Sequence, residues 1–196
     1  TYRGEVAWGG SHADYYRVNT ATGARSLIAD KLWRTMGMSP DSKWFLYLKN
    51  KHIYAYNFVS GASTQVDGGM SFIDSDDDHA YELPIWGLAG WSSDGRDVLV
   101  YDTYDMPALP LDGRGAPRNI THGVGTAQQI QLRVVRLDLP GGGGRGGRGG
   151  GGGRGGAGGA RVQDHGIDLS KPITLSAYGE WTKKSGYWTL APGQDP

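Results

Sequence analysis

The stretch IWGLAGWSSDGRDVLVYDTYDMPALPLDGRGAPRNIT, residues 85–121, reads as one unit of four antiparallel strands. A turn is predicted at 92–95, because Asp94 can hydrogen-bond its own backbone and Gly95 tolerates positive φ. The apolar run VLV at 98–100 is typical of a strand that is buried on both faces. Four strands in about 35 residues is the size of one β-propeller blade.

Parts of this unit recur earlier in the chain. Residues 38–47 (MSPDSKWFLY) match 91–100 (WSSDGRDVLV) in a Ser-x-Asp turn that is followed by an apolar run. Residues 16–24 (YRVNTATGA) share Tyr, Asn, Gly and Ala with 54–62 (YAYNFVSGA) at one constant offset. Such self-similarity favours a repeated sheet unit over an unrelated set of hairpins.

The sequence therefore predicts an all-β fold of three to four consecutive β-propeller blades, which is a partial propeller. We assign the chain in order to the end of a blade (1–30), a blade (31–66), an acidic inter-blade loop (67–84), a blade (85–121) and a further blade (122–196). The last blade is interrupted at 141–161 by GGGGRGGRGGGGGRGGAGGAR, which has no large apolar side chain. That segment is predicted to be a flexible insertion.

Composition narrows the classes of partner. The 20 basic and 20 acidic residues cancel, which gives no global preference for nucleic acid or an anionic membrane. Arg-Gly-Gly segments bind single strands by charge and stacking, but no Phe or Tyr is interleaved at 141–161, so we do not expect a nucleic-acid partner. The absence of cysteine excludes disulfides and thiolate metal sites. No apolar run approaches the length of a membrane span, so none is expected.

The densest acidic cluster is DSDDDH at 74–79. Carboxylates this close together in a loop could bind Ca²⁺ through oxygen, and the candidate metal ligands are Asp74, Asp76, Asp77, Asp78 and His79. The glycine and glutamate that an EF-hand loop requires are absent. A solvated acidic loop is the alternative interpretation, and the composition favours it. We expect no other cofactor.

Seven tryptophans are spread along the chain, and two roles are open to them. They could form a stacking platform for sugars or peptides. Packing between blades is the interpretation that we favour, because Trp buries a large apolar area while keeping one polar atom near the surface.

Four segments in order carry a resemblance to a known family: GLAGWSSDGRDVLVYDTYDMPALPLDG (87–113), RNIT (118–121), RVVRLD (133–138) and IDLSKPITLSAYGEWTKKSGYW (167–188). Together they resemble the N-terminal β-propeller region of prolyl-oligopeptidase-like serine peptidases of the S9 family. The resemblance covers most of residues 31–190. It implies a propeller that gates or docks peptide substrates for a C-terminal α/β-hydrolase domain, and it favours a periplasmic or extracellular location.

The chain departs from that family in one decisive respect. Such peptidases place their nucleophile in a Gly-x-Ser-x-Gly elbow, and the three Gly-x-Ser occurrences here, at 9–13, 37–41 and 69–73, all lack the second glycine. We therefore expect no catalytic residues in this chain and interpret it as the non-catalytic propeller segment of a larger serine peptidase. Two alternatives stay open: a structural protein whose open blades self-associate, and a Ca²⁺-dependent binding module.

Overall fold

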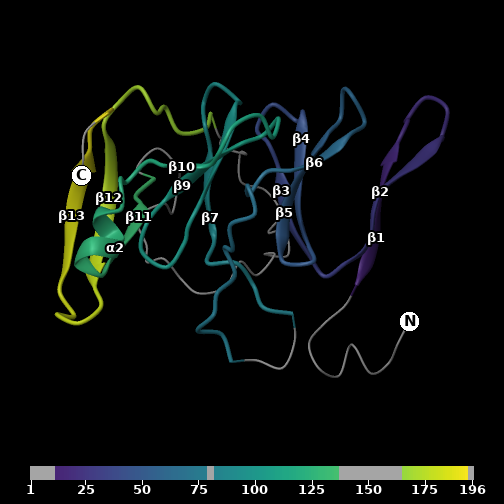
Figure 1. The fold of residues 1–196 in the computed structure, drawn as a ribbon. Helices are drawn as coiled ribbons and strands as arrows, with labels where there is room; N and C mark the ends of the chain where they lie inside the picture. Colours follow the sequence, from purple (N-terminus) through teal and green to yellow (C-terminus); the bar gives the residue numbers. More distant parts are fainter. Residues whose placement is uncertain (1–11, 79–81, 137–164, 194–196) are drawn as a thin grey trace, which may run out of the picture.

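The computed structural model describes residues 12–78, 82–136 and 165–193, and these form antiparallel sheets that follow one another in chain order (Figure 1). The sheets comprise β1 (Ala13–Val18) and β2 (Arg25–Leu32); then β3 (Arg34–Met38), β4 (Trp44–Lys49), β5 (His52–Asn57) and β6 (Ser63–Gln65); then β7 (Leu88–Trp91), β8 (Asp97–Val100), β9 (Pro107–Pro110) and β10 (Arg118–Asn119); and finally β11 (Ile130–Val134), β12 (Ile173–Gly179) and β13 (Ser185–Leu190). Within each sheet, strands that are consecutive in sequence are hydrogen-bonded neighbours. The predicted all-β, partial-propeller fold is confirmed.

The Ser-x-Asp turns of the two four-stranded sheets are the same at the level of hydrogen bonds. Ser39 Oγ donates to Asp41 at 2.6 Å and accepts the amide of Trp44 at 2.9 Å. Ser92 Oγ donates to Asp94 at 2.6 Å and accepts the amide at position 97 at 2.9 Å. The repeat that the sequence predicts is therefore a repeat of geometry, and it starts the second strand of each sheet in the same way.

A second repeated loop joins β1 to β2 and β5 to β6. The side chain of Asn19 accepts two backbone amides at 2.9 and 3.1 Å, and that of Asn57 accepts two at 2.8 and 3.0 Å. The loop between β12 and β13 has the same backbone closure, because Gly179 N donates to Lys184 O at 2.9 Å as Asn19 N does to Ala24 O at 2.8 Å. Sequence comparison missed this third copy because a glycine replaces the asparagine.

The connection between β4 and β5 is a two-residue turn. Lys49 pairs with His52, and the residues between them, Asn50 and Lys51, both have positive φ, at 52° and 67°. Positive φ at both central residues is the signature of the type I′ turn, whose twist matches that of the strands it joins.

The core lies between the sheets, and β8 is at its centre. Val98 and Val100 belong to one apolar cluster shared with the β3–β6 sheet, while Leu99 belongs to a second cluster shared with the β11–β13 sheet. All three side chains are fully buried. The prediction of a strand buried on both faces is confirmed, and each such side chain contributes about 1.5–3 kcal/mol by leaving water.

A short helix, α2 (Val124–Gln128), was not predicted. Its first turn is held by Asp105, a fully buried carboxylate that accepts the amides of Gly125 and Thr126 at 3.0 Å each and the hydroxyl of Thr126 at 2.6 Å. The hydroxyl of Thr121 also donates to it, at 2.7 Å. Four donors compensate the burial of this charge.

Some predictions lie outside the described residues. These are residues 1–11 of the assigned blade end (1–30) and the glycine-rich insertion (141–161). The strands on either side of the insertion, β11 and β12, pair with each other from Ile130–Gly179 to Val134–Leu175. In the described part of the chain, no helix has the length and apolar character that crossing a bilayer requires.

Candidate functional site: a groove between two sheets

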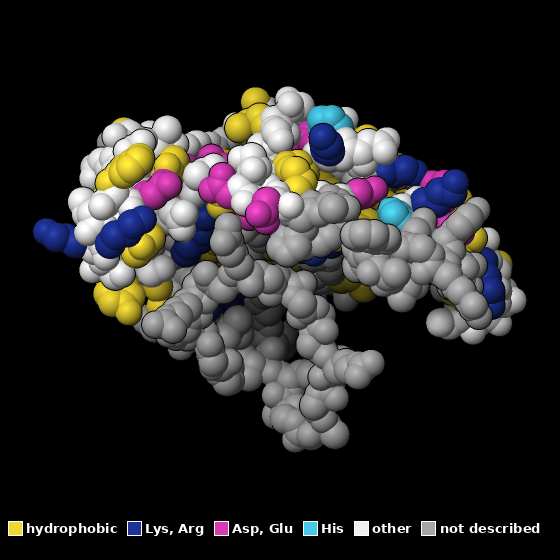
Figure 2. Space-filling view, turned by 90° about the horizontal axis from the view of Figure 1, so that it is seen from below, with side chains coloured by type: hydrophobic (Ala, Val, Ile, Leu, Met, Phe, Trp, Pro, Cys, Tyr) yellow, Lys and Arg dark blue, Asp and Glu magenta, His cyan; other side chains and the backbone are white. Residues whose placement is uncertain are grey.

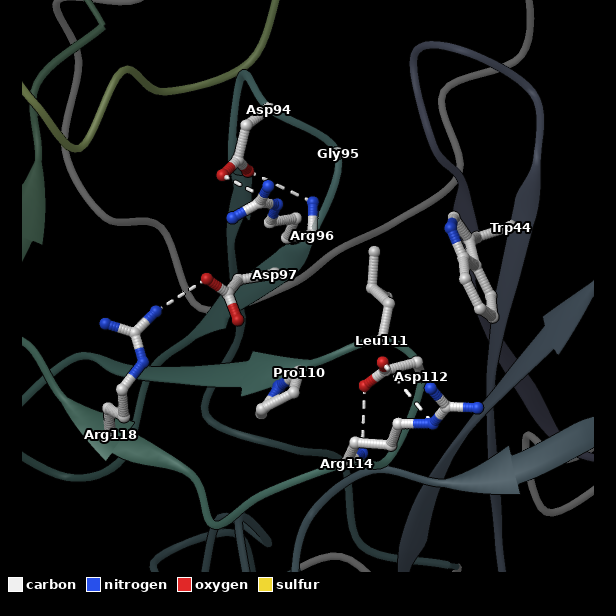
Figure 3. Close-up of a pocket in the computed structure, with 10 residues that line it drawn as sticks. All are labelled: Trp44, Asp94, Gly95, Arg96, Asp97, Pro110, Leu111, Asp112, Arg114 and Arg118. Carbon is white, nitrogen blue, oxygen red and sulfur yellow. Dashed lines mark hydrogen bonds and ion pairs between the residues drawn. The ribbon is translucent and has the colours of Figure 1, made fainter.

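The two Ser-x-Asp turns belong to neighbouring sheets and lie close together. A Cβ atom placed on Gly95 would be 3.6 Å from a carboxylate oxygen of Asp41. Beside the second turn, the sheets β3–β6 and β7–β10 leave a groove of about 530 Å³ (Figure 3). Because it lies between repeated units, its walls are set by the same turns that organise the fold.

One wall of the groove is aromatic and the other is charged. Trp44, at the start of β4, forms the first wall, and Figure 3 shows it facing residues of the β7–β10 sheet. Those residues come from the turn before β8, the end of β9 and the start of β10: Asp94, Gly95, Arg96, Asp97, Pro110, Leu111, Asp112, Arg114 and Arg118.

The carboxylate of Asp94 is fixed by its turn. It accepts the hydroxyl of Ser92 and the backbone amide of Arg96, the latter at 3.1 Å. The hydrogen bond from Ser92 is the main cause that lowers the pKa of Asp94 below its ordinary value, with the charge of Arg96 adding to it. Asp94 therefore carries a negative charge at neutral pH, and its hydrogen bonds to Ser92 and Arg96 stabilise the turn.

Arg118 forms an ion pair with Asp97, a residue of the same sheet. Its Nη2 donates to the carboxylate of Asp97 at 2.6 Å, and the Asp97 side chain is largely buried. Short hydrogen bonds between two charged groups are the strong ones, so this pair holds Arg118 in place at the start of β10.

Arg96 and Arg114 have much weaker internal partners. Arg96 Nε lies 3.8 Å from Asp94, and Arg114 Nε lies 4.0 Å from Asp112; their side chains are 84% and 90% exposed. Exposed ion pairs of this length contribute little to stability. The two guanidinium groups therefore keep donors for a ligand, and a guanidinium matches a carboxylate with two parallel hydrogen bonds.

The apolar part of the groove is small and rigid. Leu111 is almost fully buried in the core cluster that Trp44 packs against from the edge. Pro110 ends β9, and its ring also lines the groove. The indole face of Trp44 and the ring of Pro110 make a surface on which one apolar or aromatic side chain of a ligand could lie.

The side chains that line the groove are suited to binding. Its ten lining residues supply guanidinium, carboxylate, indole and apolar groups, and none is a Ser, Thr, Cys, His or Lys. Acyl transfer needs a nucleophile beside a base, which this set does not provide. The arrangement suits recognition of a chain that carries both negative and apolar groups.

The predicted metal ligands lie elsewhere, in the loop between β6 and β7. Asp74 is nearly buried and its carboxylate accepts the amide of Asp76 at 3.1 Å, while Asp76 and Asp78 are exposed and Asp77 is half-buried. His79 lies outside the described residues. Among the residues that the structure describes, no three His, Asp or Glu side chains are placed together as metal ligands. Calcium binding by this loop stays a prediction.

Figure 2 views the molecule from the side of this loop. Asp and Glu side chains are spread over that face among hydrophobic, uncharged and basic ones. The interpretation of residues 74–79 as a solvated acidic loop agrees with the exposure of Asp76 and Asp78 but not with Asp74, which is nearly buried. Asp67, at the start of the predicted inter-blade loop, is completely buried.

The burial of Asp67 was not predicted from the sequence. Its carboxylate accepts hydrogen bonds from His52, Gln65 and the amides of Ile53 and Gly69. Burial raises the pKa of Asp67, but these hydrogen bonds outweigh it and hold the pKa below its ordinary value. An aspartate after a short polar strand carries no local signal for such burial.

That these residues line one groove was also not predicted from the sequence. Trp44 was noted only among seven tryptophans, for which packing was preferred to stacking. Trp91 confirms packing, since it is buried in the core, whereas Trp44 packs at the edge of that core and lines the groove as well. The three arginines lie far from Trp44 in sequence, so only the packing of one sheet beside the other brings them together.

Comparisons with known proteins give limited information. No protein-family model matches the chain, and no curated protein matches it. A structure solved for an Agrobacterium tumefaciens protein that was assigned as a TolB is similar, with 16% sequence identity and a TM-score of 0.39, over 97% of this chain and 61% of that one. This chain thus spans about three fifths of the length of that structure. A likeness of this strength supports no argument about function.

Proposed function

We propose that this chain is the non-catalytic β-propeller segment of an S9-type serine peptidase, and that it docks or gates peptides for a hydrolase domain. The observation that carries the proposal is the groove between the sheets β3–β6 and β7–β10. It offers an indole, an apolar floor and two exposed guanidinium groups, which together suit the mixed chemistry of a peptide.

The serines agree with a non-catalytic role. Ser39, in one of the incomplete Gly-x-Ser motifs, is buried, and its hydroxyl is engaged with Asp41 and with the amide of Trp44. Ser92 is engaged in the same way in the next sheet. These two hydroxyls close turns and are engaged in hydrogen bonds there. A fluorophosphonate probe should label no serine of this chain; labelling of a single serine would contradict the assignment.

Peptide docking is tested by fluorescence anisotropy with a fluorescein-labelled tryptic digest of casein as the probe. Arg114→Ala is the first variant, because the side chain is almost fully exposed and its loss should leave folding intact. We expect binding to weaken about tenfold, as for the loss of one charge-assisted contact. The matched control is Lys183→Ala, an exposed cation of the β12–β13 turn, which should leave binding unchanged.

Trp44→Ala extends the test to the other wall of the groove. Its control is Trp181→Ala, since that tryptophan is exposed and lies outside the groove. Equal binding by all variants would mean that peptides dock elsewhere, and absence of binding by the unmodified chain would contradict peptide docking altogether.

Two alternative functions that the sequence left open also remain proposals. The first is a structural protein whose open blades pair with neighbouring copies, which concentration-dependent assembly of the chain would support. A calcium-dependent binding module through residues 74–79 is a proposal that a thermal melt with and without calcium chloride tests: a rise in melting temperature that Asp76→Asn abolishes would support it, and no change would contradict it.

A further inference from the structure

The two exposed arginines of the groove belong to two copies of one tripeptide, Asp-Gly-Arg, at 94–96 and 112–114. In each copy the aspartate accepts the backbone amide of the arginine, at 3.1 Å in the first copy and 2.8 Å in the second. The central glycine has a φ of 70° in the first copy and 67° in the second. Both arginines are therefore held by the same local turn, in which an aspartate binds the backbone two residues further on.

Strand pairing brings the two turns to the same end of the sheet β7–β10. The first turn directly precedes β8 and the second follows β9, and these strands are antiparallel neighbours in which Asp97 pairs with Pro110. The pairing continues one step further, because Leu111 N donates to the carbonyl of Arg96 at 2.9 Å. The start of one antiparallel strand lies beside the end of its neighbour. Arg96 and Arg114 are therefore presented together on one wall of the groove.

A third turn of this kind lies next to the opposite wall and differs in one respect. It is formed by residues 41–43 (DSK), where the aspartate accepts the amide of Lys43 at 3.1 Å, and it directly precedes Trp44. The ammonium group of Lys43 lies 3.0 Å from the same aspartate. The Nε atoms of Arg96 and Arg114 are instead 3.8 and 4.0 Å from the aspartates of their turns, which is beyond hydrogen-bond distance.

The groove has three arginines and three aspartates, but the charges are not equally accessible. The side chains of Arg96 and Arg114 are 84% and 90% exposed, whereas those of Asp94 and Asp112 are 56% and 54% exposed. The third arginine is already paired with the largely buried Asp97. A ligand that approaches the groove therefore meets two positive charges before it meets the carboxylates.

The two walls set an order of side chains along an extended ligand. Figure 3 shows Trp44 across the groove from the residues of the β7–β10 sheet, with Arg114 on the side of Pro110 that is nearer to the indole. Successive side chains of an extended chain point in opposite directions. Residues i and i+2 of a bound peptide would thus face one wall and residue i+1 the other. Carboxylates suit the arginine wall, and an aromatic ring suits the indole.

We propose that the groove selects acidic peptides, with two acidic side chains bound by Arg96 and Arg114 and an aromatic side chain between them on Trp44. This inference rests on the proposed function of peptide docking and adds the class of peptide. Nucleic acid is the other anion to consider for such residues. The 20 basic and 20 acidic residues of the chain cancel, so the general positive charge by which proteins hold a phosphate backbone is absent, which favours a peptide.

The probes are two rhodamine-labelled peptides with amidated C-termini, Gly-Glu-Phe-Glu-Gly and its neutral counterpart Gly-Gln-Phe-Gln-Gly. Binding to the 196-residue chain is followed by fluorescence anisotropy. In about 0.05 M sodium chloride we expect the acidic peptide to bind about tenfold more tightly, as for a charge-assisted hydrogen bond. In about 0.5 M sodium chloride this preference should shrink, because salt screens exposed charges.

Arg96→Gln and Arg114→Gln test the two contacts separately. Each should weaken the acidic peptide about tenfold and leave the affinity for the neutral peptide unchanged, because the lost interaction needs a charge on both partners. Lys43→Gln is the matched control, since it removes the cation of the third turn, which does not line the groove. It should leave both affinities unchanged. All three side chains are mostly exposed, so the variants should fold, which circular dichroism checks.

The predicted alternation is tested with a reordered peptide, Gly-Phe-Glu-Glu-Gly, which has the same composition and charge. Its two acidic side chains are neighbours and point in opposite directions, so only one of them can face the arginine wall. We expect it to bind about tenfold more weakly than Gly-Glu-Phe-Glu-Gly. Equal binding of the two peptides would overturn the alternation.

Equal binding of the acidic and neutral peptides, or an equal loss in Lys43→Gln, would overturn the inference. Tighter binding of a labelled thymidine octamer would also overturn it, because the groove would then be assigned to nucleic acid. The casein digest separates this inference from the proposed function. If Trp44→Ala weakens binding of the digest while the acidic peptide has no advantage, peptide docking stands and the selection of acidic residues fails. If neither the digest nor the peptides bind, both fail.

Discussion

The sheets β3–β6 and β7–β10 start alike and continue differently. Both have the same Ser-x-Asp turn between their first two strands. The next connection is a two-residue type I′ turn in the first sheet, whereas in the second it is a loop in which Asp102 accepts the amides of Tyr104 and Asp105. Asp105 then turns inward and holds a helix. The connection between the second and third strands is therefore set by backbone conformation in the first sheet, whereas in the second sheet the side chain of Asp102 holds it by hydrogen bonds.

The two sheets also differ in what covers them. The central sheet β7–β10 has aliphatic clusters on both faces, shared with a four-stranded sheet on one side and a three-stranded sheet on the other. The sheet β3–β6 has an aliphatic face toward the centre and an aromatic face toward β1 and β2, where Phe45, Tyr47 and Tyr54 stack in sequence. Stability should therefore be concentrated in the central sheet.

The largest effect is expected for Leu99→Ala, in the middle of β8. The side chain is completely buried, and such a truncation costs about 3–5 kcal/mol of unfolding free energy through lost transfer energy and the cavity left behind. Urea denaturation measures it. Leu27→Ala in β2, where the side chain is 52% exposed, should cost well under about 1 kcal/mol. Similar losses for both would refute a central core.

Replacing the buried carboxylate that holds α2 should have the next largest effect. Asp105→Asn keeps the shape but weakens four hydrogen bonds, and we expect a loss of about 2–3 kcal/mol by urea denaturation. The control is Asp112→Asn, whose side chain is half exposed and accepts one backbone amide within its own turn. If the control lost as much, the helix contact would not be the cause.

The same variant should change how stability depends on pH. Burial raises the pKa of Asp105, but hydrogen bonds from Thr126, Thr121 and the amide of Gly125 outweigh it and hold the pKa below its ordinary value. A carboxyl with a lowered folded pKa stabilises the fold fully above its unfolded pKa of about 4, and this contribution is lost as pH falls through the folded value. Melting curves between pH 2 and about pH 5 should therefore be less steep in pH for Asp105→Asn than for the unmodified chain.

A smaller and paired effect is expected in the repeated turns. Ser39→Ala and Ser92→Ala each remove a hydroxyl that donates to an aspartate and accepts an amide, so each should cost about 1–2 kcal/mol. If the repeat is one of structure, the two losses agree within about 0.5 kcal/mol by urea denaturation. A large difference would show that the surrounding sheet, and not the turn, sets the cost.

The smallest effect is expected for deletion of residues 141–161. The composition of this segment offers no large apolar side chain to a core, and the strands on either side of it, β11 and β12, pair with each other. Shortening the connection changes the closure entropy by less than about 1 kcal/mol, so the melting temperature should be nearly unchanged. A loss of several degrees would mean that the segment contributes contacts to the fold.

These comparisons also show why the sequence predicted some features and not others. Turns closed within five residues, such as the one at Ser92, leave a pattern that can be read directly, and so does the fully apolar run in β8. Asp67 and Asp105 could not be recognised as buried, because several of their donors are 14 to 21 residues away in sequence. The groove is non-local for the same reason, since Trp44 and Arg114 meet only through the packing of two sheets.

The hairpins β4–β5 and β11–β12 differ in how far apart along the chain their strands lie. A two-residue turn brings Lys49 and His52 together locally, whereas Val134 and Ile173 are separated by residues 135–172. Closing the longer span costs about 2–3 kcal/mol more in chain entropy. During folding, the N-terminal hairpins should therefore form first and the β11–β13 sheet should assemble last, on a surface that the central sheet already provides. The order of folding would then follow the order in which the chain is synthesised.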